Sequence, residues 1–135
     1  MPITYRIDPD RNLIFETWTG KVRAADLREY WKGYLADPEV MKIRRTIVDL
    51  RAAAIDFTGK ELWSLVQTIV TPALNGREWT TALVVLGGSV AFGVSRQYQV
   101  FAESYSKDNI FETVADAERW ITSKASSATK PAASE

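Results

Sequence analysis

The feature that most constrains the fold is an alternation along the chain between β-strand and amphipathic-helix patterns. Ile3, Tyr5 and Ile7 alternate with polar residues, which is the period-two pattern of a half-buried strand. Turn residues fill positions 8–12, and a second β-rich run covers 12–19. Two strands this close in sequence predict an antiparallel hairpin, and we expect Gly20 to end it.

Beyond the hairpin, the pattern predicts four helices and three further strands. The helices are expected at 23–36, 58–72, 89–104 and from 113 onward, and the strands at 46–50, 79–86 and 109–111. The resulting order, β-β-α-β-α-β-α-β-α, predicts an α/β fold with a mixed five-stranded sheet. Right-handed crossovers place the helices mainly on one face. An apolar patch on the other, less protected face would be a site for self-association or a ligand.

The length of 135 residues is that of one domain, which we expect to span residues 1–124. Residues 125–135 carry no aromatic or large aliphatic side chain, so they are predicted to form a disordered tail. Residues 1–6 lack the pattern of a signal peptide, and the longest apolar stretch, 82–86, is too short to span a bilayer. We therefore expect a cytoplasmic protein without stable membrane insertion.

Composition excludes most catalytic chemistry. The chain has no cysteine and no histidine, which removes disulfides, thiolate nucleophiles, zinc–sulfur sites and every histidine-dependent hydrolase mechanism. Seventeen basic and seventeen acidic residues cancel, so no net field attracts nucleic acid. No spacing of carboxylates identifies a catalytic pair. We expect a protein that works by binding, with no catalytic residue, metal or cofactor.

Two loops are candidate sites, because ligands of open α/β sheets collect where strands end and helices begin. The first loop is Asp56-Phe57-Thr58-Gly59. Thr58 could accept a phosphoryl group there, but Glu61 three residues later forms the capping-box pattern, which favours a plain helix cap. The second loop contains Gly88 and Ser89, whose glycine lets a ligand or backbone approach. A tight turn with a serine cap is the favoured interpretation of this loop.

Two groups of side chains leave a functional and a structural interpretation open. Phe92, Arg96, Gln99 and Glu103 share one stripe of the helix that follows Ser89. This stripe suits a protein partner, and equally a cation–π pair on a solvated face. The five tryptophans suit an apolar ligand between helices and sheet, although ordinary core packing is the favoured explanation.

The segment Ile47-Val48-Asp49-Leu50 leading to the 56–59 loop resembles the STAS domains, which include anti-sigma-factor antagonists. The sequence is more closely similar to the SpoIIAA-like (STAS/Sec14-like) family of small bacterial proteins. That similarity covers about residues 2–123 and is carried by the segments 3–9, 48–51 and 91–98.

The resemblance implies two modes of action. In anti-sigma-factor antagonists an Asp-Ser-Ser-Gly or Asp-Ser-Thr-Gly loop carries a phosphorylated serine. Asp56, Thr58 and Gly59 match that loop, but Phe57 stands at the serine position and cannot accept phosphate. A phosphorylation switch would have to use Thr58. The similarity in fold to Sec14-type lipid-transfer domains implies instead an apolar ligand under the helices, with Phe57 at its entrance.

Together these observations predict a non-enzymatic protein that captures a small apolar or lipid-like molecule, with Phe57 and Phe92 as walls of the site. The alternative is a STAS-type protein–protein regulatory module, which pairs with a protein partner or a second copy through the helix after Ser89. The expected binding residues are Asp56, Phe57, Thr58, Gly59, Gly88, Ser89, Phe92 and Arg96.

Overall fold

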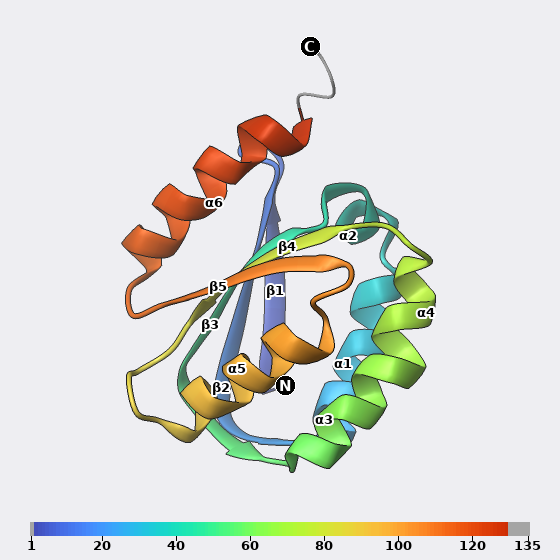
Figure 1. Ribbon diagram of the computed structural model, residues 1–135, viewed down its shortest axis with the longest axis vertical. Helices are drawn as coiled ribbons and strands as arrows, with labels where there is room; N and C mark the ends of the chain where they lie inside the picture. Colours follow the sequence, from blue (N-terminus) through green and yellow to red (C-terminus); the bar gives the residue numbers. More distant parts are fainter. Residues whose placement is uncertain (1, 130–135) are drawn as a thin grey trace.

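The computed structural model describes the backbone of residues 2–129 and the side chains of residues 2–123. Five strands form one sheet, β1 (Ile3–Asp8), β2 (Leu13–Arg23), β3 (Arg45–Asp56), β4 (Trp79–Val84) and β5 (Ser106–Phe111). The helical segments are α1 (Ala24–Ala36), α2 (Pro38–Ile43), α3 (Gly59–Leu65), the π-helical η1 (Val66–Val70), α4 (Thr71–Leu74), α5 (Val90–Phe101) and α6 (Val114–Thr129) (Figure 1).

The strands follow one another across the sheet in chain order, β1-β2-β3-β4-β5. β1 is antiparallel to β2, and the remaining neighbours are parallel. The predicted mixed α/β sheet is therefore confirmed. Gly20 does not end the second strand. It adopts a φ of 69° within β2, and the strand pairs with β3 as far as Arg23↔Asp56 because β3 is longer than predicted.

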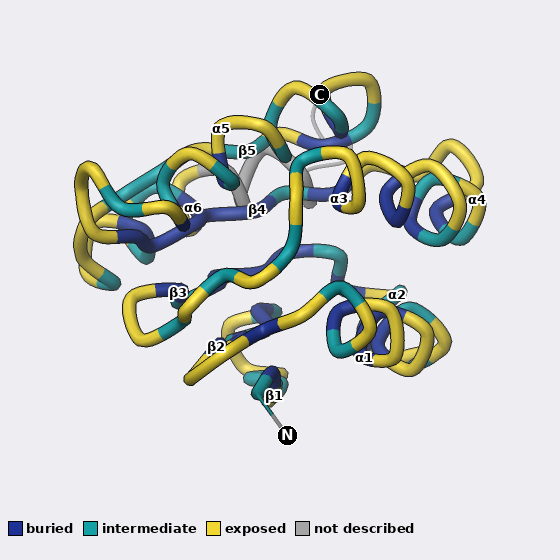
Figure 2. The backbone as a smooth tube through the Cα atoms, turned by 90° about the horizontal axis from the view of Figure 1, so that it is seen from below, coloured by how far each residue is buried: buried dark blue, intermediate teal, exposed yellow. Residues whose placement is uncertain are grey.

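The helices form two layers of unequal size. The larger core lies between the sheet and α1–α5, and the smaller one lies under α6, whose Ala117 and Ile121 pack on Ile47, Ala82 and neighbouring residues. Figure 2 shows α6 on one side of the strands and α1, α3 and α4 on the other. The helices lie mainly on one face, as predicted. α6 follows the last strand and connects no further strand, so crossover handedness does not determine its side.

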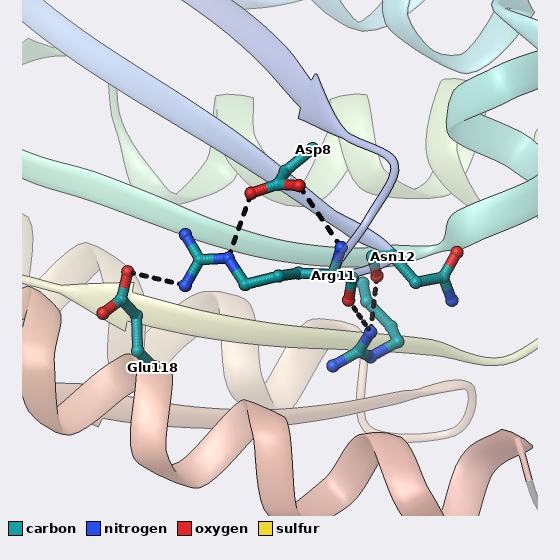
Figure 3. Close-up of polar contacts among 5 residues, drawn as sticks. Asp8, Arg11, Asn12 and Glu118 are labelled. Carbon is teal, nitrogen blue, oxygen red and sulfur yellow. Dashed lines mark hydrogen bonds and ion pairs between the residues drawn. The ribbon is translucent and has the colours of Figure 1, made fainter.

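Two arginines join α6 to the β1–β2 turn. Arg11 contacts Asp8 at 3.0 Å and Glu118 of α6 at 3.4 Å (Figure 3). Arg45 is buried and donates to the backbone carbonyls of Arg11 and Asn12, and its Nη2 donates to the Ile121 carbonyl at 3.0 Å. These contacts fix the helix over the outer face of the sheet.

Polar side chains of β1, β2 and β3 also lie on this outer face. Arg6 lies over the Phe15 ring at 4.3 Å from its centroid, and Arg51 pairs with Asp49 at 2.8 Å. Thr17, beside them on β2, is exposed. None of the large apolar residues that are exposed in the described part of the chain lies in a strand of the sheet.

The helix predicted to end at Pro72 continues to Leu74. Proline has no N–H to donate to the preceding turn, and it normally disrupts a helix interior. Here the π-helical turn comes first: the Thr71 N–H bonds to the Val66 carbonyl five residues back, and Pro72 stands at the start of α4. The wider turn lets the chain pass a proline without breaking the helical path.

At the C-terminal end, α6 runs on to Thr129, past residue 124 where the sequence predicts the tail to begin. Residues 130–135 of that predicted tail lie outside the described residues. Within the described part of the chain, no helix combines the length and apolar character needed to cross a bilayer.

Candidate functional site

A cavity of about 70 Å³ lies between the sheet and the helices of the larger layer. It is several times larger than the roughly 10–15 Å³ that one water molecule needs, so it has room for a compact group of several atoms. Its lining is mostly aromatic and aliphatic. The residues are Glu16, Trp18, Trp31, Tyr34, Leu35, Thr46, Val48, Leu50, Phe57, Leu62, Val70, Leu74, Trp79, Thr81, Leu83, Val94, Ser95 and Tyr98.

Strand periodicity explains the floor of this cavity. Three adjacent strands each contribute every second residue: Glu16 and Trp18 from β2; Thr46, Val48 and Leu50 from β3; and Trp79, Thr81 and Leu83 from β4. Alternate residues of a strand share one face, so these side chains all point toward α1–α5. The roof comes from α1, α3, η1, α4 and α5, and Phe57 closes the side next to the end of β3.

The aromatic rings of the cavity wall pack against one another in three pairs. Tyr34 lies 5.9 Å from Trp79, centroid to centroid, and Trp31 lies 6.4 Å from Tyr98. Phe57 packs against Trp18 at 6.3 Å with its ring tilted by 59°. Such pairs fall within the spacing at which aromatic rings attract one another.

Glu16 places a carboxyl group in this aromatic surrounding. Its side chain is only 5% exposed, and it accepts hydrogen bonds from Trp18 Nε1 at 2.7 Å and from the Tyr30 hydroxyl at 2.9 Å. Burial raises the pKa of Glu16 to about 7, although the two donors act in the opposite direction. The group thus titrates near neutral pH inside an otherwise uncharged lining.

Thr46 of β3, which lines the cavity, has its hydrogen-bond partners within the protein. Thr46 Oγ1 lies 2.7 Å from the Tyr34 hydroxyl and accepts from Trp79 Nε1 at 3.2 Å. These bonds hold two of the wall rings in place. Among the residues that the structure describes, no group of three or more acidic side chains is arranged to hold a metal ion.

The predicted 56–59 loop lies at the edge of the cavity, and its four residues have different surroundings. Asp56 is exposed and lies 3.8 Å from Arg23. Phe57 is half-buried in the cavity wall. Thr58 caps α3: its N–H donates to Glu61 Oε1 at 2.8 Å, and the Glu61 N–H donates to Thr58 Oγ1 at 3.1 Å. The capping box expected from the sequence is present.

Gly59 brings α3 close to α5. A Cβ at this position would lie 2.6 Å from Gln97 Nε2, so a larger residue would push the Gln97 side chain aside. Gly88 has a φ of 75° in the turn before α5, and Ser89 Oγ accepts from the Phe92 N–H at 3.1 Å. Gly88 and Ser89 form a turn and a cap, and neither lines the cavity.

Phe92 and Arg96 belong to a different hollow. With Gln99 of α5 and four residues at 109–112 they line a groove of about 390 Å³ beside β5. Phe92 is half-buried there, and Arg96 is exposed. Phe92 is therefore not a wall of the aromatic cavity, in contrast to the sequence-based expectation. The structure does not unite the predicted site residues, since Phe57 lines the cavity and the Phe92–Arg96 pair lines the groove.

Comparison of the fold with solved structures gives two matches across most of the chain. The first is an uncharacterized protein of the DUF3478 family with a SpoIIAA-like fold from Shewanella loihica. It has a TM-score of 0.61 and 17% identity over 88% of this chain and 93% of the other. The chain has a SpoIIAA-like fold. The second match is an anti-sigma factor antagonist from Mycobacterium paratuberculosis, with a TM-score of 0.54 and 16% identity over the same shares of the two chains.

At these identities the comparison establishes the fold alone. The expected resemblance to SpoIIAA-like and STAS proteins is confirmed at that level. No family model matches the sequence, and no curated protein matches it.

Within this SpoIIAA-like fold, sequence reasoning missed the residue with the most unusual chemistry. Glu16 alternates with Ile14 and Trp18, so it stands at an inward position of a predicted strand. Leu13 and Phe15 are also apolar, because β2 packs on both faces. An acidic residue at a buried position of a strand that is apolar on both faces is the signal that could have identified it.

Proposed function

We propose that the protein is a non-enzymatic binding module that holds a small ligand in the aromatic cavity. The observation that carries this proposal is the cavity itself, lined by six aromatic side chains. Cavities lined by apolar rings with a few placed polar groups are the usual form of small-molecule sites. Fold likeness does not decide function, so the proposal depends on this site.

The size of the cavity limits the size of the ligand that it can hold. A volume of about 70 Å³ accommodates a compact group and not a whole lipid molecule. Phe57 provides the entrance, because it is half-buried and follows directly on the exposed residues at the end of β3. Movement of this one ring would widen the cavity without disturbing the sheet.

Filling the cavity should abolish binding while the fold persists. Ser95 is buried on the cavity wall, so Ser95→Leu places two additional non-hydrogen atoms into free space rather than into packed core. We expect binding of a small apolar probe such as indole to weaken by roughly tenfold or more, because the leucine occupies its volume. Fluorescence titration measures this effect.

Ser104→Leu is the matched control, since Ser104 is exposed and does not line the cavity. This variant should bind like the parent protein. Equal binding by the Ser95 and Ser104 variants, with both folded by circular dichroism, would exclude the cavity as the site.

A second candidate function is a protein–protein module that pairs with another copy of this chain. The observation that favours it is the groove beside β5, which is the edge strand of the sheet and pairs only with β4 among the described strands. The groove carries both Arg96 and Glu112. In a twofold-symmetric pair each arginine could meet the opposite carboxylate, which is the self-complementarity that such an interface requires.

Charge reversal tests this second candidate. Arg96→Glu would set like charges against each other across the interface, so a dimer should dissociate at least about tenfold more readily. Sedimentation equilibrium measures the association. Arg28→Glu, on an exposed position of α1, is the control and should leave it unchanged. A parent protein that stays monomeric at all concentrations would refute this function.

A further inference from the structure

The charge balance inside the aromatic cavity is incomplete. Glu16 is the one charged residue among those that line the cavity, all of which belong to the described part of the chain. Its two hydrogen-bond partners, Trp18 and Tyr30, are neutral donors. Ionised carboxylates buried without a cation are costly, and stable proteins normally pair them. The cavity therefore has an unmet preference for positive charge.

The rings around Glu16 strengthen that preference. Trp18, Trp31 and Trp79 all line the same small space, with Tyr34, Tyr98 and Phe57 completing the wall. The face of an aromatic ring is electrically negative and attracts cations, most strongly for tryptophan. A carboxylate combined with several rings is the chemistry that recognises ammonium groups bearing alkyl substituents, because such groups are charged yet weakly hydrated.

We propose that the ligand of this cavity is a small organic cation with a quaternary ammonium head, held between the aromatic walls and paired with Glu16. This inference rests on the proposed ligand-binding function and names its ligand class. A neutral apolar molecule would fill the space without compensating Glu16. An anion would be repelled by both the carboxylate and the ring faces.

The proposal includes a definite pH dependence. The pKa of Glu16 is about 7 in the empty cavity, and a bound cation favours its ionised form. Three tyrosines lie within electrostatic reach of Glu16, namely Tyr30, Tyr34 and Tyr98. Burial raises the pKa of all three above the usual value, so they stay neutral. Cation affinity should therefore rise as the pH increases through 7.

One further carboxyl group titrates nearby. Asp108 of β5 interacts with Tyr98, and burial raises the pKa of Asp108 to about 6. It accepts from Ser106 Oγ at 2.5 Å, and hydrogen bonding by Ser106 and Thr81 acts against the effect of burial on its pKa. Asp108 does not line the cavity, so Asp108→Asn should leave the pH dependence of cation binding in place.

The test compares two ligands of the same shape. Choline is titrated against the protein at about pH 8, in parallel with the neutral alcohol in which a carbon atom replaces the choline nitrogen. Tryptophan fluorescence is the readout, because Trp18, Trp31 and Trp79 line the cavity. We expect choline to bind at least about tenfold more tightly than its neutral isostere, since only choline gains the ion pair and the cation–π contacts.

Glu16→Gln keeps the shape of the side chain and removes its charge. This variant should lose the preference for choline and bind the two ligands within about threefold of each other, with the ring contacts maintaining the residual affinity. Glu29→Gln, at an exposed position of α1, is the matched control and should behave like the parent.

The outcomes separate this inference from the proposed function. If both ligands bind equally to the parent protein, the cation preference is wrong and the cavity remains a ligand site. If neither binds, and indole does not bind either, both proposals fail. If Glu16→Gln does not fold, the pH dependence of the parent protein tests the proposal instead. The affinity for choline should then fall by roughly tenfold between about pH 8 and pH 6, while the affinity for the isostere stays constant. A constant choline affinity overturns the proposal.

A last arm identifies the source of the quaternary ammonium group. Phosphatidylcholine vesicles are sedimented with the parent protein and with Glu16→Gln. Co-sedimentation that depends on Glu16 would assign the group to a lipid head. Choline binding without co-sedimentation would assign it to a free small molecule.

Discussion

The free energy of unfolding should fall by about 3 kcal/mol between roughly pH 4.5 and pH 8 through the titration of Glu16 alone. The pKa of Glu16 is raised from 4.5 to about 7 because the carboxyl group is buried. The folded state therefore holds the proton more tightly than the unfolded state. The stabilisation is complete below the unfolded pKa and is lost as the pH rises through the folded pKa.

Urea unfolding at a series of pH values measures this loss in the parent protein and in Glu16→Gln. Glutamine does not titrate, so the variant should lack this part of the pH dependence. Asp108, with its pKa raised to about 6, adds a loss of the same sign at slightly lower pH, and Asp108→Asn separates the two. If the free energy of unfolding depends on pH in the same way in the parent protein and in Glu16→Gln, the loss does not come from Glu16.

This expected cost connects stability to the proposed function. A carboxylate that destabilises the empty protein near neutral pH is an arrangement typical of binding sites, where groups are held ready for a ligand at the expense of stability. A bound cation should recover the loss, because it favours the ionised form of Glu16. Thermal stabilisation by choline at about pH 8 would then be larger than at pH 5.

Replacing the buried Arg45 should have an effect of similar size. Arg45→Met is expected to lower the free energy of unfolding by about 3 kcal/mol, since hydrogen bonds from a charged donor contribute roughly 1.5–3 kcal/mol each. Arg45 is 4% exposed, and its guanidinium donates to carbonyls of the β1–β2 turn and of α6. Methionine fills part of the volume but leaves these carbonyl groups without that donor.

Arg11→Met is the matched control for this change. Arg11 is exposed and contacts Asp8 and Glu118 at the surface, where ion pairs contribute about 0–1 kcal/mol. Chemical denaturation should show a clearly larger loss of unfolding free energy for Arg45→Met than for Arg11→Met. Equal losses would mean that burial of the guanidinium is not what anchors α6.

Much of the fold could be predicted from the sequence because its signals are local. Hydrophobic periodicity located the hairpin, the later strands and the longer helices but not α2, and the spacing of Thr58 and Glu61 predicted the helix cap. The ends of elements were less predictable. β3 was expected to end near Leu50 and runs to Asp56, because pairing with β2 extends it. Pro72 was expected to stop a helix that a π-helical turn carries past it.

The candidate site was harder to predict, because its residues converge from most of the chain. Phe57 could be selected from its loop. The sequence could not show that Phe92 lies outside the cavity. Only the packing of α5 against β5 assigns Phe92 to the groove. Glu16 belongs to no functional motif, and its one signal is an acidic side chain at an inward position of an apolar strand.

The sequence by itself determined the order of elements, the mixed sheet and the absence of histidine and cysteine chemistry, because these depend on residue identity and on periodicity within a few turns or strands. Only the tertiary structure decided that α6 covers the outer face, that six rings enclose one cavity, and that Glu16 lies among them. These features depend on contacts between residues far apart in the chain. Burial and the shift in the pKa of Glu16 arise only when those contacts form together.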